Sequence, residues 1–304
     1  MLKPAYLSIG DHIRIISTAR KISSEELSPA IRMLESWGLN VSLGENIYAT
    51  SHQFAGTKEQ RLFDLQTAMD DPNVKAILCA RGGYGTVQLI DDIDFTNFRN
   101  DPRWLIGYSD VTALHNHINQ NLGIETLHAT MPINFPLDGK ENQSTQSLKD
   151  ALFGGKLNYS FEAKPSSILN FDHFQGQIYG GNLSIIYSLT GTSSQLRLKN
   201  NILFIEDLDE YLYHIDRMLM NLKRAGIFDS CKAVIVGGIS DMNDNTVPYG
   251  ASAEEIIKSN LEEYGIPIIF GFPAGHMEPN LALRMGATAM LENYHGQIKL
   301  SFNG

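Results

Sequence analysis

The chain has 304 residues, of which 43% are hydrophobic and 19% are charged, and its formal net charge is −10. This composition is typical of a globular protein and leaves room for two domains. The acidic balance argues against nucleic acid as the main partner, because phosphate binding requires a surplus of Lys and Arg on one face of a protein.

The sequence also bears on membrane and compartment. No apolar stretch reaches the length of a membrane span, and the first residues lack the basic and apolar regions of a signal peptide. Cys79 and Cys231 lie at or near the ends of apolar segments, without a C-x-x-C pair, which predicts buried free thiols in a reducing compartment. We therefore expect a soluble, cytoplasmic protein that does not bind a membrane.

The first half of the chain alternates β-rich runs with amphipathic helical stretches. The predicted strands are 12–17, 39–43, 75–80 and 104–108, and the predicted helices are 24–37, 58–69 and 110–121. The first helix has serine caps and two glutamates in its first turn. Such alternation predicts an α/β domain over residues 1–136, with a parallel sheet covered by helices on both faces.

The middle of the chain, residues 137–174, begins with a polar, turn-prone segment and is interpreted as a linker with some extended structure. Residues 175–304 then resume the α/β pattern and form the second predicted domain. Its strands are expected at 177–181, 202–205, 232–236 and 266–270, its helices from 182, over 211–225 and over 251–263, and a closing hairpin over 287–302.

Ser109 follows the predicted strand 104–108 and directly precedes a helix. In open α/β sheets, ligands bind beyond the carboxyl ends of the strands, and a serine on a sharp strand-to-helix turn has an exposed hydroxyl. Gly107 relieves crowding before the serine, but Val111 stands where the nucleophile-elbow motif has a second glycine. Ser109 is therefore a candidate nucleophile, and the alternative is a helix cap with Asp110 as a favourable first-turn charge.

Two further chemically useful side chains follow strands of the second half. Glu206 ends the strand 202–205 and is followed by Asp207, and His276 lies in a stiff loop after the strand 266–270. Carboxylates at a strand end serve as glycosidase acids, metal ligands or triad acids, and a loop histidine is often a plain surface residue. The shared placement of Ser, Glu and His favours a catalytic triad.

The glycine-rich segment 81–85 ends a neighbouring strand. Its backbone N–H groups could stabilise a developing oxyanion together with the N–H of Asp110. The alternatives are a phosphate cradle or a plain tight turn, and the segment lacks the Lys-Ser/Thr and G-x-G-x-x-G patterns of nucleotide sites. No motif indicates a metal, since the loop 241–245 lacks the Gly and Glu of a calcium loop, and no cofactor is expected.

These segments as an ordered set resemble the LD-carboxypeptidases of serine peptidase family S66, over about residues 10–289. The set consists of Arg81-Gly82-Gly83-Tyr84-Gly85, Gly107-Tyr108-Ser109-Asp110, Gly180-Gly181-Asn182-Leu183, Glu206-Asp207 with Ile215-Asp216-Arg217-Met218-Leu219, and Gly275-His276. The resemblance implies a Rossmann-like N-terminal domain that carries the serine and a smaller α/β C-terminal domain that carries Glu and His. It further implies an active site at the domain interface and a homodimer.

By this resemblance, Ser109 is the nucleophile, His276 the general base and Glu206 the group that orients the imidazole. The backbone N–H groups of Asp110 and Gly83 would form the oxyanion hole. Substrate contacts are expected from Arg81, Gly82, Tyr84 and Asn182, with Arg81 or the helix start at Asn182 as candidates for holding a terminal carboxylate. Many members have His-Gly-Pro-Met where this chain has His128-Ala129-Thr130-Met131. This difference bears on the local wall of the cleft and leaves the triad unchanged.

The implied reaction is hydrolysis of the bond between the L-centre of diaminopimelate and the terminal D-Ala of the murein tetrapeptide, in cytoplasmic recycling of cell-wall peptides. An alternative is the related microcin C self-immunity hydrolases, which cleave an acyl-nucleotide antibiotic. Those relatives use an additional aromatic residue for adenine, whereas Trp37 and Trp104 of this chain both precede the second domain. A third alternative is a non-catalytic binding protein with two α/β domains around a cleft.

Overall fold

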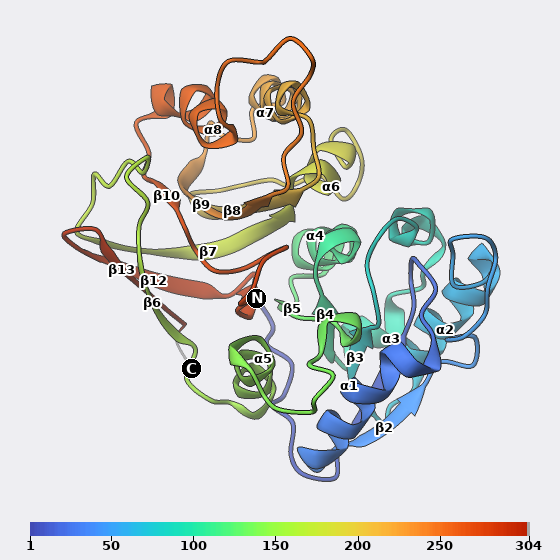
Figure 1. The fold of residues 1–304 in the computed structure, drawn as a ribbon. Helices are drawn as coiled ribbons and strands as arrows, with labels where there is room; N and C mark the ends of the chain where they lie inside the picture. The colour runs from blue at the N-terminus through green and yellow to red at the C-terminus, as the bar shows by residue number, and fades with distance from the viewer. Residues whose placement is uncertain (303–304) are drawn as a thin grey trace.

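The computed structural model describes residues 1–302, and within them two sheets are packed with helices (Figure 1). The first sheet has the order β11 (Leu283–Met285), β5 (Thr126–His128), β4 (Trp104–Gly107), β3 (Val74–Cys79), β1 (His12–Ile16) and β2 (Asn40–Leu43). Its strands are parallel except for the antiparallel pair β11–β5. The α/β class and the parallel sheet predicted for the first half are confirmed.

The second sheet combines a parallel and an antiparallel part. Its order is β10 (Ile268–Phe270), β9 (Cys231–Ser240), β8 (Asn201–Leu208), β7 (His173–Asn182), β12 (Thr288–Tyr294), β13 (Gln297–Phe302) and β6 (Asn158–Glu162). Strands β10 to β7 are parallel, and β7, β12, β13 and β6 pair in antiparallel fashion. The predicted C-terminal hairpin is therefore present as β12 and β13.

The helices begin where the sequence provides caps. They are α1 (Ser24–Ser36), α2 (Lys58–Asp70), α3 (Thr96–Asn100), α4 (Thr112–His117), α5 (Gln143–Phe153), α6 (Leu183–Ser188), α7 (Leu212–Arg224) and α8 (Ala253–Leu261). Capping boxes start α1, α2, α5 and α8, so that side chains satisfy N–H groups that the helix leaves free. None of the helices in the described range is long and apolar enough to span a membrane.

The segment 137–174, interpreted as a linker with some extended structure, contains the strand β6 and also the helix α5, which the sequence analysis did not predict. Helix α5 buries Leu148, Ala151 and Leu152 in the core, and β6 extends the second sheet by pairing with β13. The polar turn at 138–142 ends in Asn142, which caps α5, and it is this cap that the sequence interpretation missed. Strand β11, which was placed in the second domain, pairs instead with β5 of the first sheet.

One hydrophobic core runs between the two halves of the molecule. It includes Leu78 and Trp104 of the first sheet, Leu148 of α5, and Phe204 and Ile298 of the second sheet. A second core lies between the second sheet and helices α7 and α8, whose buried faces follow the predicted helical spacing. Helix α4 lies between the two halves (Figure 1), so the carboxyl ends of β4, β7 and β8 are held near one another.

Candidate active site

Ser109 lies on a sharp turn that leaves the sheet at the end of β4. Its φ angle is 62°, a left-handed conformation that side-chain-bearing residues rarely adopt, and the 3-10 turn Ser109–Val111 leads into α4. A Cβ atom on Gly82 would lie 2.9 Å from the Ser109 Cβ and 3.0 Å from its Oγ. The glycine loop that follows β3 therefore packs directly against the serine side chain, which it can do only because residue 82 has no side chain.

Buried polar groups tie the loops around this serine together. The Asp110 carboxylate accepts a hydrogen bond of 2.8 Å from the Thr86 N–H, and burial raises the pKa of Asp110 despite the nearby charge of Arg61. The Arg61 guanidinium, itself buried, donates to the carbonyl of Thr18 at 2.8 Å and to that of Gly85 at 3.0 Å. The loops after β1, β3 and β4 are thus cross-linked into one rigid wall.

Glu206 and His276 form a hydrogen-bonded pair. Glu206 lies two residues before the carboxyl end of β8 and is fully buried. Its Oε2 atom lies 2.6 Å from His276 Nδ1 and accepts the His276 backbone N–H at 3.1 Å. Burial alone would lower the pKa of His276, but the hydrogen bond and charge of Glu206 outweigh this effect, and the pKa lies above its ordinary value. The pair therefore stabilises the protonated imidazole, as a general base requires.

Aromatic rings support His276 from the first domain. The Tyr108 ring lies 4.8 Å from the His276 ring, and the Tyr108 hydroxyl donates to Asn134 Oδ1 at 3.0 Å. Behind Tyr108 lies His128, which is fully buried, with ring distances of 5.8 Å to Tyr108 and 5.0 Å to Phe204. Burial holds the pKa of His128 well below its ordinary value, so this second histidine is neutral at neutral pH.

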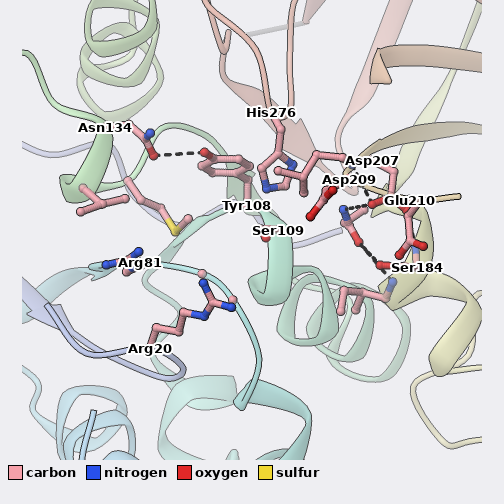
Figure 2. Close-up of a pocket in the computed structure, with 17 residues that line it drawn as sticks. Arg20, Arg81, Tyr108, Ser109, Asn134, Ser184, Asp207, Asp209, Glu210 and His276 are labelled. Atoms are coloured by element: carbon pink, nitrogen blue, oxygen red, sulfur yellow. Dashed lines mark hydrogen bonds between the residues drawn. The ribbon is translucent and has the colours of Figure 1, made fainter. Parts of the chain in front are cut away.

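A cavity of about 500 Å³ opens between these groups. It is lined by Arg20, Arg81, Gly82, Gly83, Tyr108, Ser109, Met131, Ile133, Asn134, Asn182, Ser184, Ile185, Asp207, Leu208, Asp209, Glu210 and His276. Figure 2 shows Ser109 near its middle, two arginines on one side and three acidic residues on the other. The serine and the histidine thus share one cavity, built from both halves of the chain.

Most of the predicted site residues come together here. Arg81, Gly82, Gly83 and Asn182 line the cavity beside Ser109 and His276, Glu206 lies buried behind His276, and Asp110 lies buried beneath the serine turn. Tyr84 does not belong to the lining: its side chain is 48% exposed and lies 6.3 Å, between ring centres, from Phe54. The Tyr84 side chain faces solvent beside Phe54, and the substrate contact expected from it stays a prediction.

Asp207 is a structural partner of the site whose role the sequence did not indicate. Its carboxylate accepts hydrogen bonds of 2.9 Å from Asn182 Nδ2 and from the Ser184 N–H, and so holds the start of α6. Burial and the neighbouring charge of Glu206 raise the pKa of Asp207 to about 7. Asp207 therefore fixes the position of Asn182 rather than acting as a second free carboxylate.

Arg20, Tyr108 and Asn134 also line the cavity without having been predicted. Arg20 follows the carboxyl end of β1, so the rule that led to Ser109 and Glu206 could have found it. Tyr108 directly follows β4, so the same rule could have found it as well. Asn134 had no such signal, because its hydrogen bond to Tyr108 joins residues that are 26 positions apart.

No group of three or more His, Cys, Asp or Glu side chains within residues 1–302 is arranged to hold a metal ion. In the acidic loop 241–245, Asp244 Oδ1 accepts N–H groups of Asn245 at 2.8 Å and Tyr249 at 3.0 Å. The Asp244 carboxylate is thus hydrogen-bonded by nearby backbone N–H groups, as in an ordinary surface turn.

Comparison with known proteins gives consistent matches over nearly the whole chain. Residues 13–129 match the LD-carboxypeptidase N-terminal domain and residues 175–291 match the LD-carboxypeptidase C-terminal domain. A probable murein peptide carboxypeptidase of Bacillus subtilis is 34% identical over 290 residues, which are 95% of this chain and 91% of that protein.

Two solved structures share the fold. Muramoyltetrapeptide carboxypeptidase from Oxalobacter formigenes superposes with a TM-score of 0.85 at 25% identity and covers 96% of this chain and 99% of its own. The microcin C7 self-immunity protein MccF in complex with aspartyl sulfamoyl adenosine gives a TM-score of 0.85 at 22% identity, with 100% and 99% covered. At that identity, the second match concerns the fold alone.

Proposed function

The chain belongs to the LD-carboxypeptidase family, peptidase family S66, and from this premise we propose that it is a serine carboxypeptidase that releases the terminal D-Ala of the murein tetrapeptide. The observation that carries the proposal is the 2.6 Å contact between Glu206 Oε2 and His276 Nδ1 at the wall of the cavity that also contains Ser109. A serine, an imidazole and a buried carboxylate are the three groups that acyl transfer to a hydroxyl requires.

In the proposed mechanism, the Ser109 hydroxyl attacks the carbonyl of the bond before D-Ala. His276 takes the hydroxyl proton at Nε2, because Nδ1–H is engaged by Glu206. The imidazolium then gives this proton to the departing D-Ala amine, and the acyl group stays on Ser109. Water activated by His276 hydrolyses the ester, which restores the hydroxyl. Glu206 favours the charged imidazole in both halves of the reaction.

The oxyanion of the tetrahedral intermediate is proposed to be bound by the N–H groups of Gly83 and Asp110. The close approach of Gly82 to Ser109 supports this assignment, because it brings the glycine loop beside the attacking oxygen. The Gly83 N–H donates to no acceptor within the described residues, so it is free to bind an oxyanion. Such backbone donors stabilise charge without having to reorganise during the reaction.

Substrate contacts are proposed from the remaining lining residues. Arg81 supplies positive charge to the cavity wall, and Gly82 supplies a flat wall beside the serine. Asn182 lines the same cavity, where its side chain is held by Asp207 and by the N–H of Ile185. Recycling of cell-wall peptides in the cytoplasm, by a homodimer, is the setting that the family resemblance supports.

The test is release of D-Ala from purified murein tetrapeptide, followed by mass spectrometry of both products. Wild-type protein is expected to convert tetrapeptide to tripeptide, and Ser109→Ala is expected to abolish turnover with an unchanged circular dichroism spectrum and melting temperature. An unchanged rate in the folded Ser109→Ala protein would exclude the covalent mechanism. A parallel assay with aspartyl sulfamoyl adenosine tests the alternative acyl-nucleotide substrate, because faster cleavage of that compound would favour it.

A further inference from the structure

The charged side chains that line the cavity differ in whether the protein itself neutralises them. The acidic wall is engaged throughout: Asp207 accepts from Asn182, Asp209 accepts the Asn243 side-chain amide at 2.8 Å, and Glu210 lies 2.5 Å from His214 Nδ1. These carboxylates already have donors in the folded chain. Each of them therefore has at least one hydrogen-bond donor within the fold.

The arginine wall is different. Arg81 Nη1 lies 3.7 Å from Glu26 Oε1 and 3.5 Å from the Lys21 carbonyl, so a carboxylate and a carbonyl already share its charge. The guanidinium of Arg20 has no hydrogen bond and no ion pair within residues 1–302, although it lies in the same cavity wall (Figure 2). Arg20 is thus the charged lining residue that the fold leaves available to an anion.

The backbone of Arg20 is held in place. Arg20 forms an isolated antiparallel β-bridge with Phe54. Two backbone hydrogen bonds flank it, from the Lys21 N–H to the Gln53 carbonyl at 3.1 Å and from the Ala55 N–H to the Ala19 carbonyl at 3.0 Å. Two residues earlier, the Thr18 carbonyl is bound by the buried Arg61 guanidinium. A cation on such an anchored loop loses less conformational entropy on binding than one on a free loop.

The side-chain stem of Arg20 points along the glycine loop toward the serine. A Cβ atom on Gly83 would lie 2.6 Å from Arg20 Cγ, and one on Gly82 would lie 2.9 Å from Ser109 Cβ. Two consecutive glycines therefore separate the arginine stem from the serine. The terminal carboxylate of a carboxypeptidase substrate lies within about one residue, ~3.5 Å, of the scissile bond, so its partner has to lie close to the nucleophile.

We propose that Arg20 binds the terminal carboxylate of the substrate, and that this contact restricts the enzyme to peptides with a free C-terminus. The proposal rests on the proposed function, and it assigns the role to Arg20 in place of Arg81. The planar guanidinium can donate two parallel hydrogen bonds to a carboxylate, a geometry that lysine cannot reproduce. Gly83 would then also make room for the Arg20 side chain, since any larger residue at position 83 would displace it.

The experiment compares two substrates that differ only in terminal charge: murein tetrapeptide ending in D-Ala and the same peptide ending in D-alaninamide. kcat/KM is measured for wild type, Arg20→Gln and Arg81→Gln, with Arg224→Gln as the control that removes an equal charge from the exposed end of α7. Wild type is expected to prefer the free acid by about 10- to 100-fold. Arg20→Gln should lose most of this preference, mainly through KM, and Arg224→Gln should retain it.

Binding measurements keep the two proposals distinguishable. Calorimetric affinities for both peptides are determined on Ser109→Ala and on the Ser109→Ala, Arg20→Gln double variant, so that no turnover is needed. A preference for the acid that persists without Arg20, in rate or in affinity, overturns the assignment, as does equal binding of acid and amide by the Ser109→Ala protein. Absence of D-Ala release by wild type would instead refute the proposed function, while the affinities still decide the role of Arg20.

Discussion

One carboxylate oxygen, Glu206 Oε2, accepts two hydrogen bonds from the same residue, from Nδ1 of His276 at 2.6 Å and from its backbone N–H at 3.1 Å. This double contact fixes both the position of the loop and the orientation of the ring. It also fixes the tautomer, because a carboxylate can only accept, so Nδ1 carries the proton. The other ring nitrogen, Nε2, is then available as an acceptor on the cavity side.

The substitution Glu206→Gln tests this relationship through the pH dependence of activity. Because the hydrogen bond and charge of Glu206 raise the pKa of His276, their weakening should move the acid limb of the kcat/KM profile to lower pH. At its optimum, the variant should lose roughly 10²- to 10⁴-fold in kcat/KM. The profile is recorded between pH 4 and 9 with murein tetrapeptide.

The control for that profile is Glu263→Gln, which removes an equal charge from an exposed ion pair with Lys223. Its acid limb should coincide with that of wild type. A limb that stays in place in Glu206→Gln would mean that a group other than His276 controls the acid side.

Gly82→Ala tests the close packing of the glycine loop against Ser109. The new Cβ would lie 2.9 Å from Ser109 Cβ, so either the loop or the serine has to shift, and kcat/KM is expected to fall about 100-fold. Gly139→Ala is the matched control, because its φ of 73° costs about 1 kcal/mol of stability while no atom lies within 4 Å of the new methyl group. It should lower the melting temperature and keep full activity, and normal activity in Gly82→Ala would refute the packing argument.

Arg61→Met tests the buried cross-link between the loops around the site. The substitution leaves the carbonyls of Thr18 and Gly85 without their donor and removes a charge near Asp110, so the free energy of unfolding should fall by about 3 kcal/mol. Urea denaturation measures this loss. Arg224→Met, at the exposed end of α7, should change stability by less than about 0.5 kcal/mol. Similar losses in the free energy of unfolding of both variants would contradict a stabilising role of the cross-link.

His128→Leu tests the neutral state of the buried histidine. Since burial depresses the pKa of His128 in the folded chain, only the unfolded chain takes up its proton as pH falls below 6.5. This residue alone should therefore cost the wild type up to about 2 kcal/mol of stability between pH 7 and pH 5. In His128→Leu that part of the loss should disappear, whereas stability at pH 7 should change by only about 1 kcal/mol. If the free energy of unfolding fell equally in both proteins between pH 7 and pH 5, the neutral state of His128 would be contradicted.

The sequence by itself determined most of the local structure and the candidates for the catalytic groups. The buried spacing of Ile215, Met218 and Leu222 predicted α7, and the alternation of strands and helices predicted the parallel sheet of the first half. Both patterns depend on residues a few positions apart. The rule that ligands bind at strand ends singles out Ser109, Glu206 and His276 from the sequence alone. Caps in polar segments were less visible, and helix α5 was missed for that reason.

The tertiary structure alone decided which side chains share the cavity. It brought His276 to Glu206 across 70 residues and joined β11 to the first sheet. It also placed Arg20 in the cavity wall with no side-chain partner among residues 1–302. It also set the pKa directions, since burial and charge depend on neighbours that are distant in the chain. The physical reason is that packing acts through space, whereas periodicity and caps act along the chain.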